Sequence, residues 1–560
     1  FAAKSVSVNL MRFSTKKKII NLYRVTTDCA QINLNTDSLG VMNLTALIQS
    51  LRSDTVHKSK DPFTINVSRA RLISTTFAMR HELADTTRPG INFQDLVISD
   101  ANIDINHINI SGDTIGFIIS NMDFVEKSGF LLESFRADVS FSSQHMDFDK
   151  LRIRAMGSNL NVPHLKMSYD GWEDMRDFVE TVKLNVEVDK SLLNTNFLAS
   201  FAPTLGEFDI SLTLSGNFKG PVCDIRGKAV DLTIGKNTEL KANISISGLP
   251  DIHNSLLVFD IKNLTIAPND LAELKKTDTG TPLFVFPENL KVLENISYTG
   301  NFTGFISDFV AYGTLESAIG SISMDLAIKP TQQKSTRFNG VVSTKRLDLG
   351  KLTNNPLLGT TSLWASIKGS TDYKRNIEAQ TEATIYSIVA NDYDYNNIKI
   401  SGNLSNKTYV GSVFLDDPNI KLNFMGKVDL SDSIPVFNFS AFVPKIDLVK
   451  LNFNKVDSIS QASFLLTSKF SGSNLDNSMG EVKVLNCIYK NQNGEIKTSD
   501  ITIVANNTAD SKLISLKSEF IEGELRGKYN YANIFSSFSQ LIYRYIPALN
   551  PENKKPELVL

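Results

Sequence analysis

The stretch Tyr298–Ile328, which reads YTGNFTGFISDFVAYGTLESAIGSISMDLAI, carries the alternation that decides the fold. Its last part, from Gly320 onward, places an apolar side chain at every second position: Ile322, Met324, Leu326 and Ile328. Successive side chains of an extended strand point to opposite faces, so this period of two predicts a strand with one apolar and one polar face. The glycines predict turns at GNFTG (300–304) and at Gly313.

The same pattern recurs on both sides of this stretch. The segment FDISLTLSGNF (208–218) places five apolar residues on one side: Phe208, Ile210, Leu212, Leu214 and Phe218. The segment IKLNFMGKVDLS (420–431) does the same with Leu422, Phe424 and Val428. GNFKG (216–220) repeats GNFTG after a matching strand, but the spacing between such units is irregular, which argues against a solenoid of fixed period.

Short amphipathic helices interrupt the strands. Residues 43–51 have Leu44, Leu47, Ile48 and Leu51 on one helical stripe. The other helices or helical turns are predicted at 172–180, 191–201, 268–276 and 533–546. The apolar stripes of 43–51 and 191–201 are expected to lie in or against the apolar face of the sheet and to narrow it locally, with packing on an outer wall as the alternative.

The chain divides into three regions on this pattern. Residues 1–190 form an N-terminal β region containing the helix 43–51, residues 191–530 form an elongated, repeat-like β region, and residues 531–560 form a closing helix and a linker. In NIDINHINISG (102–112) the alternation slips at His107, which predicts a bulge. The chain opens on Phe1, so either an N-terminal segment has been removed or this is part of a longer protein.

Composition excludes several classes of protein. Lys and Arg number 58 and Asp and Glu 60, a net charge of −2, so no basic excess indicates nucleic acid. The three cysteines, Cys29, Cys223 and Cys487, are too far apart in sequence for a CxxC pair or a compact metal site, and we expect them to be buried. No run reaches the ~18–20 apolar residues of a transmembrane helix.

Catalytic and metal-binding motifs are missing from the sequence. It has no phosphate-binding glycine loop, no HExxH and no Ser/His/Asp or Cys/His arrangement among its six histidines. Asp392 and Asp394 imitate the start of a calcium loop, but the sixth and twelfth positions are Asn397 and Asn403 where Gly and Glu are required. This segment instead predicts a polar turn with exposed tyrosines. We therefore expect no enzyme, no cofactor and no metal.

An apolar face on every strand must be covered, and the predicted helices are too few to cover it. The sheet can fold on itself as a sandwich or barrel, or it can remain an open trough that meets an apolar ligand. The lack of a sharp linker across residues 204–530 favours the trough.

Five segments, in this order, carry a resemblance to a known family. They are EKSGF (126–130), LSGNFKG (214–220), the YTGNFTGF…GSISMDLAI stretch, FNGVVSTKRLDLGKLTNNPLLG (338–359) and NDYDYNNIKISGN (391–403). The chain resembles the TamB family of translocation and assembly module proteins, in its Bacteroidetes-type form, and more distantly the AsmA-like proteins. The similarity covers essentially the whole chain.

The resemblance implies an all-β fold: an elongated, U-shaped antiparallel sheet, called a β-taco, that forms an open hydrophobic trough. It implies bridge-like transfer of phospholipid between inner and outer membrane, in support of outer-membrane integrity, with the twelve apolar residues named above as candidate lining and acyl chains as the ligand. Members of this family are anchored in the inner membrane by an N-terminal segment, cross the periplasm, and end near an outer-membrane barrel of the Omp85 family. We expect both end regions to be missing here.

Two other functions remain open. The chain could be a periplasmic scaffold or chaperone that assists outer-membrane protein assembly or translocation, with an exposed strand edge as the template for a client strand. It could also be a plain structural or adhesive β protein.

Overall fold

The structure is a computed structural model. It describes residues 1–38, 42–43, 64–87, 89–203, 206, 209–276, 279–282, 288–331, 335–372, 376–508, 511–528 and 539–546. Strands dominate these residues, which confirms the all-β class. The chain forms two compact units, unit 1 (Phe1–Ala318) and unit 2 (Ile319–Leu560).

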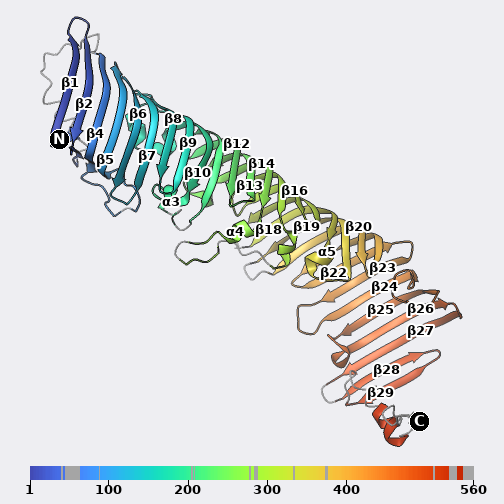
Figure 1. Ribbon diagram of the computed structural model, residues 1–560. Helices are drawn as coiled ribbons and strands as arrows, with labels where there is room; N and C mark the ends of the chain where they lie inside the picture. Colours follow the sequence, from blue (N-terminus) through green and yellow to red (C-terminus); the bar gives the residue numbers. More distant parts are fainter. Residues whose placement is uncertain are drawn as a thin grey trace, which may run out of the picture. The chain divides into compact units, whose positions relative to one another are not determined.

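Unit 1 is a sheet of consecutive strands (Figure 1). The strands are β1 (Ser5–Ser14), β2 (Ile19–Asp28), β3 (Gln31–Thr36), β4 (Thr64–His81), β5 (Asp95–Ser111), β6 (Thr114–Glu126), β7 (Leu131–Phe141), β8 (His145–Ala155), β9 (Ser158–Ser168), β10 (Lys183–Asn194), β11 (Ser211–Gly220), β12 (Asp224–Ile234), β13 (Thr238–Ser247), β14 (Leu256–Ile266), β15 (Ile296–Gly304) and β16 (Phe309–Ser317). From β4 to β16 each strand pairs antiparallel with the next.

The beginning of unit 1 departs from this rule. β2 and β3 lie end to end along the same edge of β4, and both pair with it in parallel, while β1 pairs antiparallel with β2. The break between β2 and β3 falls at Cys29, whose φ of 48° is left-handed. Cys29 is exposed there, so the expectation that every cysteine is buried is wrong for this one, whereas Cys223 and Cys487 are half-buried.

Unit 2 repeats the consecutive antiparallel arrangement. Its strands are β17 (Gly320–Pro330), β18 (Thr336–Asp348), β19 (Leu358–Thr371), β20 (Ile377–Ala390), β21 (Tyr393–Ser405), β22 (Thr408–Asp416), β23 (Ile420–Asp429), β24 (Val436–Asp447), β25 (Ser460–Ser471), β26 (Met479–Asn491), β27 (Gly494–Asn507), β28 (Lys512–Ser518) and β29 (Glu522–Gly527). Each pairs antiparallel with the next.

The two turns predicted in the opening stretch are wrong, because the glycines lie inside strands. Gly300 is in the middle of β15 and pairs with Gly313 in the middle of β16. The chain turns between these two glycines, at Phe305–Asp308, where the Phe305 N–H donates to the Asp308 carbonyl at 2.7 Å. GNFKG likewise continues β11 to Gly220. A glycine in these strands marks a bend rather than an end.

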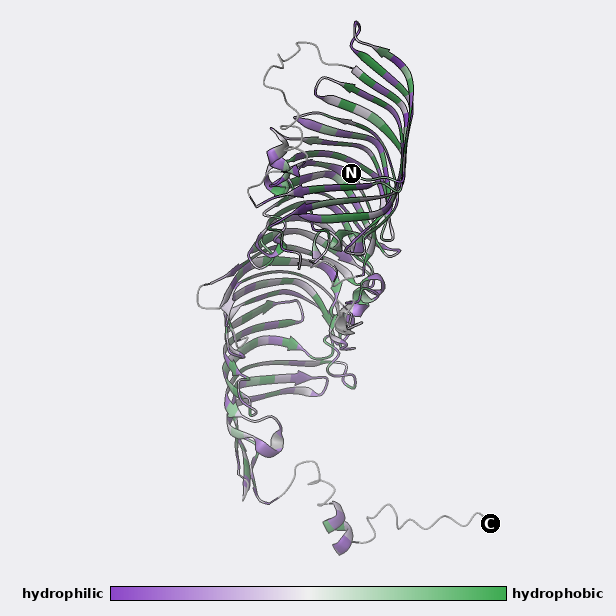
Figure 2. Ribbon diagram, turned by 90° about the vertical axis from the view of Figure 1, so that its left-hand side faces the viewer, coloured by the Kyte–Doolittle hydropathy of each residue, from purple (hydrophilic) through white to green (hydrophobic). Residues whose placement is uncertain are grey.

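Bulges also bend the strands. The bulge predicted at His107 is confirmed: His107 has a φ of 55°, and β5 gains one residue against β6 at this point. Ala229 and Arg346 have the same left-handed backbone at the register shifts of β12 and β18. Because a bulge increases the local twist and bend of a strand, the strands become curved (Figure 2).

Helices are few and short among the described residues. Unit 1 holds η1 (Trp172–Met175), α2 (Phe178–Thr181), α3 (Thr195–Ala199), η3 (Ile252–Asn254), α4 (Pro268–Ala272) and η4 (Glu288–Leu293), and unit 2 holds α5 (Leu349–Thr353) and η5 (Leu475–Asn477). The helical turn at 172–180 and the helix within 268–276 are therefore confirmed. Residues 539–545 are helical, inside the predicted 533–546.

The helix predicted at 191–201 is shorter than expected. Residues 191–194 complete β10, where they pair with β11, and α3 begins only at Thr195. The predicted helix 43–51 lies outside the described residues except for Asn43. The boundary predicted at residue 190 falls within β10, and the three-region division stays a prediction.

Candidate functional site

The candidate site is the apolar face that each unit's sheet presents. In unit 1, Leu212 pairs with Leu193 on β10 and with Ile234 on β12. Leu214 lies two residues along the same face and pairs with Leu232. Side chains at directly paired positions share a face, so apolar residues from three consecutive strands form one continuous surface.

Phe218 extends this surface toward the other end of β11. It pairs with Val186 and with Gly227, and a β-carbon added to Gly227 would lie 3.0 Å from the Phe218 ring. The ring therefore fills the space over the glycine. Ile210 precedes β11 and is bonded to Thr195 outside the strand, and Phe208 lies outside the described residues.

The most buried part of this face lies farther along unit 1, on β6 to β9. Ile119, Ala137, Val139, Leu151 and Val162 are each less than 10% exposed and form one cluster. Aromatic rings from the same strands pack against it, with Phe135 and Phe148 centred 6.2 Å apart.

In unit 2 the predicted lining residues lie on one face as well. Ile322, Met324, Leu326 and Ile328 pair in turn with four residues of β18: Thr344, Val342, Gly340 and Phe338. Leu422, Phe424 and Val428 pair with three residues of β22: Leu415, Val413 and Tyr409. None of these paired positions carries a charge. Both sets form part of the apolar face of unit 2, whereas Leu212 and Leu214 belong to the apolar face of unit 1.

Aromatic rings cover the in-strand glycines of these faces. A β-carbon added to Gly402 or Gly411, which pair with each other, would meet the Tyr409 ring or hydroxyl at 2.5–2.6 Å. Tyr298 covers Gly300 and Gly313 in the same way in unit 1, and its hydroxyl donates to the Tyr312 carbonyl at 3.1 Å. Burial raises the pKa of both tyrosines. The rings keep the lining apolar where the strands bend.

Further aromatic contacts cross the strands of the apolar faces. The Phe424 and Phe439 rings lie 5.1 Å apart, those of Phe437 and Phe470 4.7 Å apart, and those of Phe302 and Phe309 5.0 Å apart. Such contacts stabilise sheet faces through cross-strand packing.

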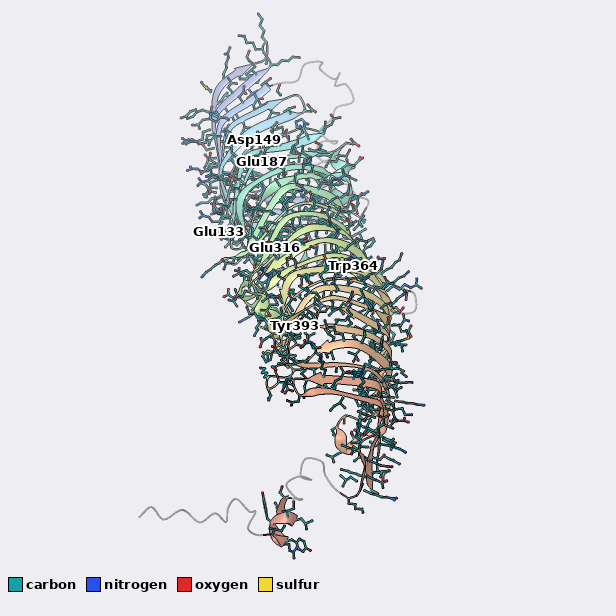
Figure 3. All side chains as sticks on the ribbon, turned by 90° about the vertical axis from the view of Figure 1, so that its right-hand side faces the viewer. Glu133, Asp149, Glu187, Glu316, Trp364 and Tyr393 are labelled. Carbon is teal, nitrogen blue, oxygen red and sulfur yellow. The ribbon has the colours of Figure 1, made fainter. Side chains whose placement is uncertain are left out.

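The opposite face of each sheet is largely polar. Thr213, between Leu212 and Leu214, pairs with Thr233. Glu133, Asp149, Glu187 and Glu316, labelled in Figure 3, are exposed carboxylates of unit 1. The predicted alternation of the two faces therefore holds on β11.

One predicted helix lies against the apolar face. The Phe197 ring of α3 is 6.1 Å from that of Phe130, which forms a buried cluster with Leu132 and Ala155. Ile153 and Phe135 of the lining pack on the same cluster. This contact agrees with the expectation that the segment 191–201 lies against the apolar face.

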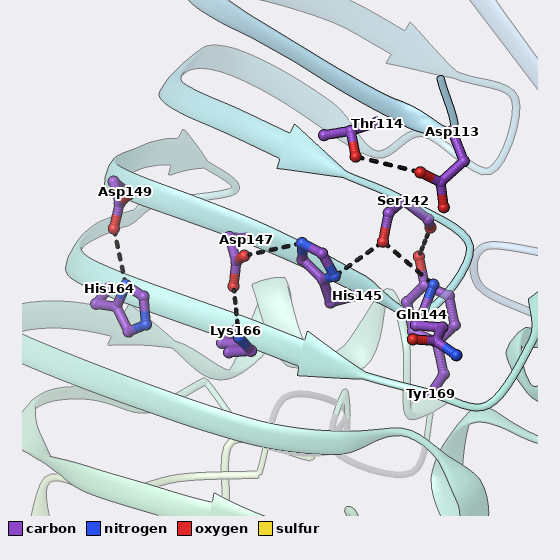
Figure 4. Close-up of polar contacts among 10 residues, drawn as sticks. All are labelled: Asp113, Thr114, Ser142, Gln144, His145, Asp147, Asp149, His164, Lys166 and Tyr169. Atoms are coloured by element: carbon purple, nitrogen blue, oxygen red, sulfur yellow. Dashed lines mark hydrogen bonds and ion pairs between the residues drawn. The ribbon is translucent and has the colours of Figure 1, made fainter. Parts of the chain in front are cut away.

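A Ser–His–Asp series, which the sequence did not suggest, joins Ser142 in the turn after β7 to His145 and Asp147 at the start of β8 (Figure 4). Ser142 Oγ is 2.8 Å from His145 Nδ1, and His145 Nε2 is 3.6 Å from Asp147 Oδ2. Ser142 is only 5% exposed, however, and its hydroxyl also accepts the Gln144 N–H at 3.3 Å. Because a nucleophile must be reachable by substrate, we interpret this series as a brace for the β7–β8 turn.

The NDYDYNN segment differs from its prediction, since its tyrosines are not exposed. Tyr393 and Tyr395 are half-buried, with rings 4.8 Å apart. The Tyr393 hydroxyl donates to the buried carboxylate of Asp417 at 2.6 Å, and burial together with this bond raises the pKa of Tyr393. Asp417 lies 24 residues away in sequence, and no local pattern indicates this partner.

In the described part of the chain, no group of three or more His, Cys, Asp or Glu side chains could hold a metal ion. None of the helices described is both long enough and apolar enough to cross a bilayer.

Comparison with known proteins yields no match: no family model, no curated protein and no solved structure matches this chain. The fold and the apolar faces therefore provide the basis for a functional proposal.

Proposed function

We propose that this chain carries phospholipid along the apolar faces of its sheets, as a periplasmic bridge between the inner and outer membranes. The observation that carries the proposal is the continuity of uncharged and mostly apolar paired positions across consecutive strands. On β10 to β12 and on β17 to β18 these positions join neighbour to neighbour. Acyl chains favour a surface that is apolar and carries no charge, and these paired positions have both properties.

The polar reverse of the same strands supports the proposal. A sheet in a closed sandwich buries its apolar face fully, whereas the lining residues here are half-buried: Leu212, Leu214 and Phe424 belong to that class. Half-buried apolar rows on a curved sheet suit a ligand that slides along them. In this proposal the full protein reaches the inner membrane through an N-terminal anchor and the outer membrane through a barrel of the Omp85 family.

The test compares two charges on one strand. Leu212→Asp places a carboxylate on the apolar face, and Thr213→Asp places it on the polar face next to it. Leu212→Asp should retain the fold, because backbone pairing is unchanged and an open face admits some water, but it should reduce bound and transferred phospholipid several-fold. Thr213→Asp should cost under ~0.5 kcal/mol and leave both unchanged.

The readouts are circular dichroism for folding, mass spectrometry for phospholipid that co-purifies, and a vesicle-to-vesicle transfer assay with the full-length protein. Equal retention and transfer by two folded variants would reject the conduit at this position.

A specific observation keeps the chaperone function as a second candidate. β1 lies at an edge of the unit 1 sheet, and among the described residues it pairs only with β2 along its length. Val6, Val8, Leu10 and Phe13 on this strand are each more than half exposed. An edge with exposed apolar side chains favours addition of another strand, and Arg12 is the single charged residue of β1. Co-purification of unfolded outer-membrane protein, lost on a proline substitution at Val8, would support this candidate instead.

A further inference from the structure

The polar face of unit 2 carries large apolar side chains that the alternation does not explain. Val410 and Phe414 on β22, Met425 on β23 and Phe442 on β24 are 48, 45, 69 and 48% exposed. We name these four residues the polar-face patch. None of them belongs to the apolar face, because each alternates along its strand with the residues whose side chains form that face.

The four residues adjoin one another across the strands. Phe414 and Phe442 pair with the same residue, Asn423, from its two sides. Met425 lies two positions along β23, between Ser412 and Ser440. The patch is thus one surface of neighbouring side chains. A cluster of exposed large apolar groups marks a surface that another body covers.

Lysines surround the patch. Lys399 on β21 pairs with Phe414 on β22, and Lys427 on β23 pairs with Val410 on β22. Lys445 lies three residues after Phe442 on β24. Lys469 follows on β25, paired with Asn438. Within the described chain, no ion pair or hydrogen bond of the Lys399 or Lys469 ammonium groups is found, and both side chains are exposed.

Acidic side chains near the patch are already paired. Asp416 binds Lys421 at 2.8 Å, and Asp429 binds Lys427 at 2.9 Å. Glu481 on β26, which pairs with Lys469, forms an ion pair with Lys483. Lys445 donates to the Pro418 carbonyl at 2.6 Å and keeps its charge. The surroundings of the patch therefore carry an excess of positive charge.

A hollow opens beside the patch on the same face. It has a volume of about 1030 Å³, and its lining includes Val410, Met425, three lysines (Lys427, Lys469 and Lys483) and one carboxylate, Glu481. Pockets that hold small ligands span roughly 300–1,000 Å³, so a phospholipid headgroup fits within it.

We propose that the polar-face patch docks unit 2 on the surface of an anionic phospholipid bilayer. The phenylalanine, methionine and valine side chains enter the boundary between headgroups and acyl chains, and the lysines contact lipid phosphates. A second copy of the chain fits less well, since a symmetric contact would bring the lysines of both copies together. The proposal concerns the face opposite the lipid-carrying one and does not depend on the proposed function.

The test measures co-sedimentation of the full chain with vesicles of phosphatidylcholine, alone or with about one third phosphatidylglycerol. The double variant Phe414→Ser/Phe442→Ser should lower the partition coefficient about tenfold or more, since each phenylalanine loses an apolar contact. Lys399→Gln/Lys469→Gln should remove most of the preference for anionic vesicles and most of its dependence on salt.

The matched control is Phe453→Ser/Phe520→Ser, which removes two phenylalanines of unit 2 that are 62 and 65% exposed but lie outside the patch. It should bind as the unmodified chain does. The single variant Met425→Ser repeats the test with a side chain that contributes least to packing.

Two results would overturn the proposal. One is vesicle binding that patch variants leave unchanged while circular dichroism shows them folded. The other is self-association in sedimentation velocity that the patch variants abolish, which would assign the patch to a second copy. Leu212→Asp serves to separate the two proposals, because it should impair lipid transfer and leave vesicle binding intact.

Discussion

Asp270 shows how one carboxylate holds a turn of the sheet. Its Oδ2 accepts the backbone N–H groups of Lys236, Asn237 and Thr238 at 3.1, 2.6 and 2.8 Å. These three residues join β12 to β13, and Asp270 reaches them from α4. The short helix is therefore fixed to the turn by a single buried side chain.

This arrangement predicts a dependence of stability on pH. The bonds from Asn237, Lys236 and Thr238 favour the charged form and outweigh burial, so the pKa of Asp270 is lowered from its usual 3.8. A lowered folded-state pKa gives stabilisation that is present above the unfolded value and is lost as pH falls through the folded one. Asp270→Asn should cost roughly 1–3 kcal/mol near neutral pH.

The measurement is thermal unfolding of the unmodified chain and Asp270→Asn from pH 7 to pH 2. The gap in unfolding temperature between the unmodified chain and Asp270→Asn should close in the acid range. Glu316→Gln, a change at an exposed carboxylate, should unfold at the same temperature as the unmodified chain at every pH. A gap that stays constant down to pH 2 would contradict the assigned role.

Glycine marks the limit of sequence reasoning at the scale of single residues. Alternation predicted the faces of Leu212 and Met324 correctly, because that pattern is local. Gly300 and Gly313 were expected at turns, since glycine is frequent there. In the fold they pair mid-strand under the Tyr298 ring, and only the partner strand shows that a side chain would not fit.

At the scale of elements, the junction of β10 and α3 decides where a helix covers the apolar face. Asn194 ends the strand, and its side chain accepts the Asn196 N–H at 2.8 Å as an N-cap. The residues before it pair with β11. The apolar stripe of the helix can be extended back to Ser191 in the sequence, because Leu193 fits its spacing. The local pattern does not show that residues 191–194 pair with β11 instead.

Phe197 connects this helix to the lining. Its ring packs against Phe130 at 6.1 Å and Phe201 at 5.4 Å. Phe197→Ala should destabilise unit 1 by about 2 kcal/mol, less than the full cost of a buried phenylalanine because the side chain is only half-buried. Denaturant titration measures this cost. Phe201→Ala, at a ring that is 48% exposed, should cost less, and a larger loss there would mean that Phe197 is not the main contact.

At the scale of the molecule, strands hydrogen-bond to their neighbours in sequence. Within β4–β16 and within β17–β29, each strand pairs with the strands next to it in sequence in the same unit. The free energy of unfolding in such an arrangement is close to a sum of contributions from neighbouring strand pairs. A destabilising substitution therefore affects mainly the strands beside it. The all-β class follows from alternation alone, whereas this local distribution of stability follows from the pairing.

Hydrogen exchange followed by mass spectrometry checks this expectation. In Leu212→Asp the exchange of amides on β10 to β13 should become faster, whereas that of β4 and β5 in the same unit should remain as in the unmodified chain. Unfolding should proceed in steps rather than as one two-state transition. A uniform acceleration across unit 1 would show that the sheet opens as a whole.

The consecutive antiparallel pairing also makes the length of each unit's apolar lining proportional to its number of hairpins. Removing or adding one hairpin reverses the chain direction twice, so every other strand keeps its direction and the face that it presents. Neighbouring strands lie about 4.8 Å apart, and each such event therefore changes the length of the apolar lining by roughly 10 Å. Duplication or loss of a hairpin in the gene can thus adjust the distance that a unit spans in fixed increments, without any change to the chemistry of the surface.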